Sequence, residues 1–207
     1  MCIRDSIESL SKEDNELVLC GVGGNGKFAH FVEEHRVNDM IVERDIASIM
    51  VVTDRDEETD AKIARNINNS LEIISIRAGQ WIKNSIVDSF GQTKSIGTYL
   101  LVIPANEKGA LERVIINVLG DIPEEAEITQ EVIRFIDNLK ENFLEELKQI
   151  NKANKATVGT FFSVRYPKNA MRSFGTFVSK IDWSKSDSLR ELFRPFEHLG
   201  TEKIYAL

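Results

Sequence analysis

The sequence predicts an α/β fold with a mainly parallel sheet flanked by helices and a helical C-terminal part. Two observations carry this prediction. Three short apolar runs alternate with helical segments between residues 16 and 119, an alternation typical of parallel strands joined by crossover helices. From Ile128 onward, apolar residues recur at three- and four-residue steps, which indicates a helical part over about residues 128–207.

Each predicted strand is a short, continuous apolar run. The runs are residues 16–20 (ELVLC), 47–53 (ASIMVVT) and 96–103 (IGTYLLVI). Because the apolar residues are continuous rather than alternating, all three are expected to be buried strands. Residues 72–95 carry glycines and only short apolar runs, which indicates a hairpin or a loop.

Helical periodicity follows each run. Residues 27–35 are expected to form one helix, and residues 57–71 a second with Ile63 and Ile67 one turn apart and acids in its first turn. Further helices are expected over 110–119, from 128 to about 150, over 152–166 and over 188–199, the last broken at Pro195.

The composition limits the class of protein. The chain has 207 residues and a net charge of −7, which disfavours nonspecific duplex binding over its whole surface, and no apolar run approaches the roughly 18 residues of a membrane-spanning helix. Residues 1–12 open without periodicity and are expected to be disordered or artefactual, with residues 13–207 forming one domain. Cys20 is the only cysteine of that domain and no secretory signal precedes it, so a disulfide framework is excluded and a cytoplasmic location is expected.

The stretch VLCGVGGNGKF, residues 18–28, permits three interpretations. Its glycines match the dinucleotide fingerprint G-x-G-x-x-G. The acid that ends the next strand, Asp54, is however followed two positions later by Asp56, which ribose binding does not require. The same letters match the P-loop spacing G-x-x-x-x-G-K, but Phe28 stands where the metal-binding Ser or Thr belongs. The candidates for phosphate or nucleotide binding are Gly21, Gly23, Gly24, Gly26 and Lys27.

The third interpretation starts from the segment VVTDRDEE. Asp54 and Asp56 follow a predicted strand at positions i and i+2, so on an extended chain their side chains point to the same side. Two carboxylates at the carboxyl edge of a parallel sheet suit a hard divalent cation such as Mg²⁺ or Mn²⁺. The structural alternative is that Asp54 caps the following helix and Asp56 lies in its first turn.

The segments LVLCGVGGNGKF, VVTDRDEE, VIPANEKGALERVI and the tail NKATVGTFFSVRYP…W…LRELFRPFEHL resemble bacterial TOPRIM-like proteins of a domain of unknown function related to OLD-type nucleases. The resemblance covers about residues 17–199. It implies a TOPRIM-like fold, catalytic and metal-binding roles for Asp54 and Asp56, Glu112 as a further metal ligand, and a setting in phage defence. Cys20 occupies the position of the family's usual glutamate, and a thiol is a poor magnesium ligand, so the expected enzyme is a degenerate metal-dependent nuclease.

A basic, aromatic segment, FFSVRYPKNAMRSFG, offers a nucleic-acid surface. Arg165, Lys168 and Arg172 are the candidates for contacts with a phosphate backbone; the alternative is an ordinary charged surface loop. The leading hypothesis is a divalent-metal-binding protein that acts on nucleic-acid phosphodiesters. The competing one is a non-catalytic module that binds a nucleotide or a partner through the glycine loop. A partner protein or homo-oligomer is compatible with both, and no membrane contact is expected.

Overall fold

The computed structural model describes residues 7–12, 15–22, 25–169 and 178–199. The chain divides into two compact units, the first comprising residues 1–53, 58–102 and 195–207 and the second residues 54–57 and 103–194. Each unit has a hydrophobic core of its own. The two units are described separately, and the expectation of one domain over residues 13–207 stays a prediction.

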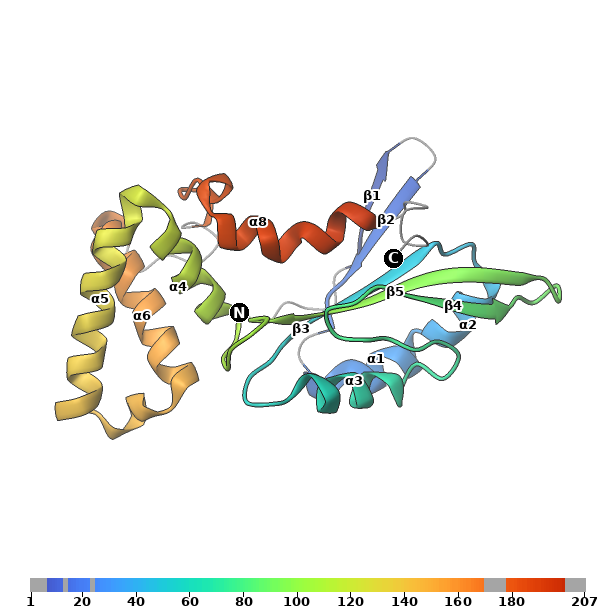
Figure 1. The fold of residues 1–207 in the computed structure, drawn as a ribbon, viewed down its shortest axis with the longest axis horizontal. Helices are drawn as coiled ribbons and strands as arrows, with labels where there is room; N and C mark the ends of the chain where they lie inside the picture. Colours follow the sequence, from blue (N-terminus) through green and yellow to red (C-terminus); the bar gives the residue numbers. More distant parts are fainter. Residues whose placement is uncertain (1–6, 13–14, 23–24, 170–177, 200–207) are drawn as a thin grey trace. The chain divides into compact units, whose positions relative to one another are not determined.

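The first unit is built on a three-stranded sheet in the order β3-β5-β4, with β3 at Ser48–Asp54, β4 at Ile82–Val87 and β5 at Thr93–Ile103 (Figure 1). β4 and β5 form an antiparallel hairpin, as residues 72–95 suggested. The Gly97 N–H donates to the Ala47 carbonyl and the Arg55 N–H to the Ile103 carbonyl. Residue numbers rise together along both strands, so β3 and β5 run parallel. The sheet is mixed, and the expected mainly parallel sheet is not confirmed.

The first predicted strand lies outside that sheet. Residues 16–20 fall in β2 (Asn15–Cys20), which pairs antiparallel with β1 (Ile7–Lys12) as a separate two-stranded sheet. Val18, Leu19 and Cys20 are exposed, so the expectation of a buried strand was wrong. A short apolar run does not by itself distinguish a core strand from a strand of a hairpin. β1 also lies within the segment that was expected to be disordered or artefactual.

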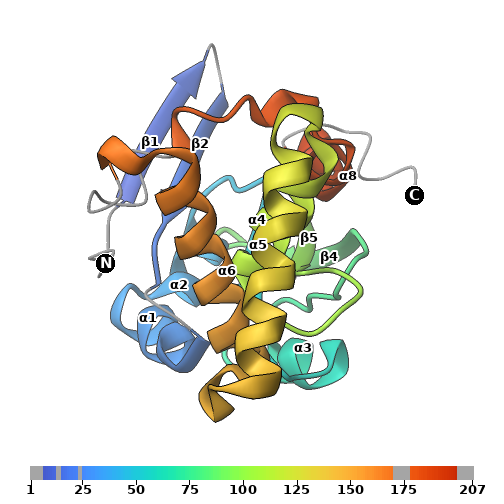
Figure 2. The ribbon, with the colours of Figure 1, turned by 90° about the vertical axis from the view of Figure 1, so that its left-hand side faces the viewer.

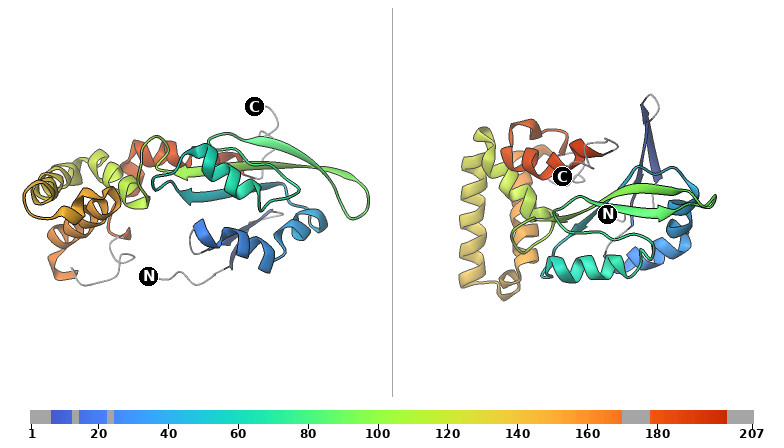
Figure 3. Two further views of the ribbon diagram at one scale, coloured as in Figure 1. Left: turned by 90° about the horizontal axis from the view of Figure 1, so that it is seen from below. Right: turned by 45° about the vertical axis from the view of Figure 1, so that its right-hand side comes forward.

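Three helices cover one face of the three-stranded sheet (Figures 1 and 3). They are α1 (Phe28–Glu34), which follows a 3₁₀ turn η1 (Asn25–Lys27), α2 (Val37–Glu43) and α3 (Asp60–Asn68). Ile63 and Ile67 of α3 are buried against Ile96 and Leu100 in one core, as their one-turn spacing predicted. α1 and α3 confirm the helices expected at residues 27–35 and 57–71, whereas α2 was not predicted.

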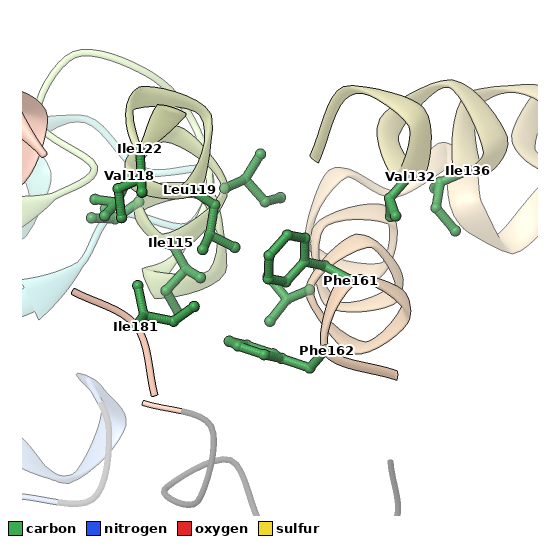
Figure 4. Close-up of a cluster of buried hydrophobic side chains, with 12 residues drawn as sticks. Ile115, Val118, Leu119, Ile122, Val132, Ile136, Phe161, Phe162 and Ile181 are labelled. Carbon is green, nitrogen blue, oxygen red and sulfur yellow. The ribbon is translucent and has the colours of Figure 1, made fainter. Parts of the chain in front are cut away.

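The second unit is a helical bundle. α4 (Leu111–Asp121), α5 (Pro123–Asn142) and α6 (Ile150–Arg165) pack against one another (Figure 2), and α8 (Asp187–Phe193) packs on α4. Figure 4 shows Phe161 and Phe162 of α6 pointing toward Ile115 and Leu119 of α4. Burial of such large apolar side chains is the main source of stability for a bundle of this kind. The helical C-terminal part is thus confirmed.

Periodicity misplaced both ends of one helix in this bundle. The helix expected from residue 128 to about 150 begins earlier, at Pro123, and ends at Asn142. Proline suits a first helical position because its missing N–H has no intrahelical partner there. Phe143 and Leu144 continue the apolar pattern but are exposed. The remaining short elements are the 3₁₀ turns η2 (Glu145–Lys148), η3 (Pro167–Asn169), η4 (Trp183–Lys185) and η5 (Arg194–His198), the last placing the predicted break at Pro195.

Candidate functional site

Asp54 is the last residue of β3 and lies in the second unit. Its Oδ1 accepts a hydrogen bond from the backbone N–H of Leu111, the first residue of α4, at 3.2 Å. A carboxylate in this position satisfies one of the unpaired N–H groups of a helix start. α3, the helix that follows Asp54 in sequence, is instead capped by the Thr59 hydroxyl. The structural alternative considered from the sequence therefore named the wrong helix.

Asp56 is held by two other segments. Its backbone is left-handed, with φ of 51°, a conformation uncommon outside glycine. Its carbonyl accepts the N–H of Gly109 at 2.9 Å, and its Oδ1 accepts Nδ2 of Asn151 at 3.0 Å. The chain is not extended through residues 54–56, so the alternation argument for a shared side-chain direction does not apply. The two aspartates are placed by loop and helix contacts instead.

The electrostatics of Asp54 are those of a carboxylate beside other acids. Burial raises its pKa, and the negative charges of Asp56 and Glu112 raise it further, whereas the Leu111 N–H and the charge of Lys155 lower it. Asp54, Asp56 and Glu112, the three predicted metal-site residues, therefore lie in one unit, where Asp56 and Glu112 both act on Asp54, although they come from two separate segments of the sequence. A raised carboxylate pKa with a specific charge partner is a frequent property of functional sites.

Asp54 and Asp56 suit Mg²⁺ better than a structural Zn²⁺. In the described ranges, no three His, Cys, Asp or Glu side chains form a metal-binding cluster. A structural zinc site needs about four protein ligands, whereas Mg²⁺ is usually held by one or two carboxylates, with waters and substrate phosphates completing its shell. Asp54 and Asp56 supply the hard oxygen donors of that second arrangement.

Arg55, which separates the two aspartates, fixes the loop between β5 and α4. Its backbone N–H donates to the Ile103 carbonyl at 2.7 Å, its Nε to the Pro104 carbonyl at 2.9 Å and its Nη2 to the Ala105 carbonyl at 2.5 Å. This loop is part of the VIPANEKGALERVI segment. Arg55 therefore connects that segment to the stretch that carries the two aspartates.

The glycine-loop candidates belong to the first unit. Gly23 and Gly24 lie outside the described residues. Gly26 and Lys27 are exposed, and Lys27 precedes α1 without a side-chain cap. Cys20 lies at the end of β2, and partial burial raises the pKa of its thiol. A thiol with a raised pKa is largely protonated near neutral pH, which disfavours both metal binding and nucleophilic attack.

One of the three predicted nucleic-acid residues, Arg165, forms an ion pair within the second unit. Arg165 donates from Nε and Nη2 to the Glu125 carboxylate at 2.7 and 3.2 Å, and Glu125 is buried. A bidentate pair with a buried carboxylate occupies the donors that would otherwise contact a phosphate backbone, so the position of Arg165 favours a structural role. Lys168 is exposed on η3, and Arg172 lies outside the described residues.

Sequence reasoning missed three residues at this site. Arg55 fixes the loop, Asn151 binds Asp56, and the charge of Lys155 acts on Asp54. Asn151 and Lys155 are four residues apart on α6 and therefore on one helix face. That spacing was visible in the sequence, but nothing in the sequence indicated which element that face would meet.

The raised pKa of Asp54 predicts a stability effect. Because the folded-state pKa lies above the unfolded one, the favourable contribution of this group is complete at low pH and is lost as the pH rises through the folded value. We expect Asp54→Asn, which keeps an acceptor for the Leu111 N–H, to raise the free energy of unfolding at neutral pH. The gain should vanish below the ordinary value of 3.8. Urea titrations of both proteins from pH 3 to pH 8 measure it, and a gain independent of pH would contradict it.

A protein-family model matches residues 4–197, and its description is "Protein of unknown function (DUF3226)". The matched range includes residues 4–12 of the segment expected to be disordered or artefactual. No curated protein and no solved structure matches the chain. Within the described part of the chain, none of the helices has the length and apolar character needed to cross a bilayer.

Proposed function

The chain belongs to the DUF3226 family, and we propose that it binds Mg²⁺ or Mn²⁺ through Asp54 and Asp56 and acts on nucleic-acid phosphodiesters. The observation that supports this most strongly is the environment of Asp54. This carboxylate is partly buried beside the charges of Asp56 and Glu112, an arrangement that costs free energy in the absence of a cation. A purely structural cap of α4 would not need two further acids beside it.

The residues of the proposed site have different roles. Asp54 and Asp56 hold the cation, and Glu112, in the first turn of α4, supports a second one. A bound divalent cation supplies a Lewis acid that polarises the phosphate and stabilises the leaving oxygen. Arg55 keeps the loop before α4 in place through the carbonyls of Pro104 and Ala105, which supports the position of Glu112 relative to Asp54 and Asp56.

The resemblance to TOPRIM-like proteins related to OLD-type nucleases supports the same proposal and carries the suggestion of phage defence. Cys20, in the place of the usual glutamate, supports a degenerate enzyme with weak or altered cleavage. The second candidate is a non-catalytic nucleotide- or partner-binding module that uses the glycine loop. The exposed Lys27 and the protonated character of the Cys20 thiol favour this alternative.

Nuclease assays test the proposal. Plasmid and single-stranded DNA or RNA are incubated with the wild-type chain and with Asp54→Ala, in Mg²⁺ and in Mn²⁺. Asp137→Ala serves as a matched control, because Asp137 is an exposed acid of α5 in the same unit. We expect cleavage by the wild type and the control and its loss in Asp54→Ala. Equal cleavage by all three would contradict the proposal, and no cleavage with tight nucleotide binding by calorimetry would select the binding module.

A further inference from the structure

Asp56 receives support from a helix that lies far away in sequence. The Nδ2 of Asn151, in the first turn of α6, donates to its Oδ1 at 3.0 Å. The backbone of Asp56 is fixed separately by the N–H of Gly109. With its left-handed φ of 51°, Asp56 is in a conformation that surrounding contacts must maintain. Asn151 supplies the contact that determines where the carboxylate points.

The Oδ1 of Asn151 indicates that this residue has a role other than stabilising the fold. Its Oδ1 is buried and has no hydrogen-bond partner among the described residues, although its Nδ2 is paired. A buried acceptor without a partner costs about 1–3 kcal/mol, and such groups in native proteins call for an explanation. An asparagine selected only for packing would be replaceable by leucine at this site. The satisfied half of the amide is the half that faces Asp56.

A neighbour on the same helix supplies a comparison. Asn154 is one turn further along α6 and is 7% exposed. Within the described part of the chain, its Nδ2 also has no hydrogen-bond partner. Its Nδ2 lies close to Gly109, 3.3 Å from the position that a Cβ would occupy there. The structure records no hydrogen bond from the Asn154 side chain to either aspartate in the described residues. Asn151 and Asn154 therefore share residue type, helix and burial of a polar atom, but of the two only the Asn151 amide donates a hydrogen bond to an acid of the site in the described residues.

We propose that Asn151 is a positioning residue for the metal site, holding the Asp56 carboxylate in the orientation that binds a divalent cation. This inference rests on the proposed function. Residues that hydrogen-bond to metal-binding carboxylates orient them, and their loss commonly weakens metal affinity by about 10- to 100-fold. Lys155, on the same face of α6, places a positive charge near Asp54, so this face approaches both acids.

The test measures Mn²⁺ binding to the full chain by electron paramagnetic resonance, together with thermal unfolding without metal. We expect Asn151→Leu to bind Mn²⁺ about 10- to 100-fold more weakly than the wild type. Asn154→Leu, the matched control, should retain wild-type affinity. Asn151→Gln keeps an amide donor on a longer side chain and should recover part of the lost affinity.

The outcomes separate this inference from the proposed function. Wild-type chain that binds no Mn²⁺ overturns both. Wild-type binding with unchanged affinity in Asn151→Leu overturns only the positioning role. Equal losses of affinity in Asn151→Leu and Asn154→Leu, with parallel losses of thermal stability, also overturn it, because they would indicate general damage to α6.

Discussion

Phe161→Ala should lower the unfolding free energy of the second unit by about 3–5 kcal/mol, the usual cost of removing a buried aromatic side chain. Phe161 is 1% exposed and lies among side chains of α4, α5 and α6 (Figure 4). Substitution leaves a cavity that neighbouring helices fill only in part. Phe135→Ala is the matched control, because Phe135 of α5 is 52% exposed and its loss should cost less than about 1 kcal/mol.

The two tryptophans allow the effect to be assigned to one unit. Trp81 is buried in the first unit, and Trp183 packs against the core of the second. In urea titrations followed by fluorescence, a Trp81→Phe background reports the second unit and a Trp183→Phe background reports the first. Phe161→Ala should shift the Trp183 transition to lower urea and leave the Trp81 transition in place. Equal shifts of both transitions would mean that the two cores unfold as one.

Arg165→Met is expected to cost about 3 kcal/mol, within the range for breaking a buried ion pair by removing one partner. The variant leaves the Glu125 carboxylate, 6% exposed, without the two donors that now bind it. Arg134→Met removes the exposed pair with Glu131 and should cost less than about 1 kcal/mol. Urea unfolding of the three proteins measures the difference. Similar small losses in both variants would contradict a stabilising role for the Arg165–Glu125 pair.

The fold was predictable where an apolar pattern was compatible with only one type of secondary structure. Ile63 and Ile67 lie one turn apart and are buried on α3, and the apolar run from Ile96 to Ile103 forms most of β5. The apolar run at residues 16–20 is compatible with either a core strand or a strand of an exposed hairpin. Only tertiary contacts decide between these two structures. The end of α5 at Asn142 was also hidden, because Phe143 and Leu144 continue the apolar pattern while exposed.

The acidic residues of the candidate site could be predicted from the sequence, but their hydrogen-bond partners could not. Asp54, Asp56 and Glu112 were identified from the D-x-D segment and the resemblance, and Asp56 and Glu112 both act on the pKa of Asp54. The argument that Asp54 and Asp56 point to the same side of an extended chain was wrong, because the backbone of Asp56 is left-handed rather than extended. The partners Leu111 and Asn151 could not be predicted, since hydrogen bonds across 57 and 95 positions depend on how β3, α4 and α6 pack.

Mn²⁺ binding by the wild-type chain and by Asp54→Asn tests the metal site most directly. Asp54→Asn keeps the shape of the side chain and is expected to fold at least as stably at neutral pH, so lost binding cannot be attributed to unfolding. Free Mn²⁺ is measured by electron paramagnetic resonance during titration near pH 7.5. The metal site predicts saturable binding by the wild type and its loss in Asp54→Asn. Equal binding by the two proteins, or none by either, would contradict it.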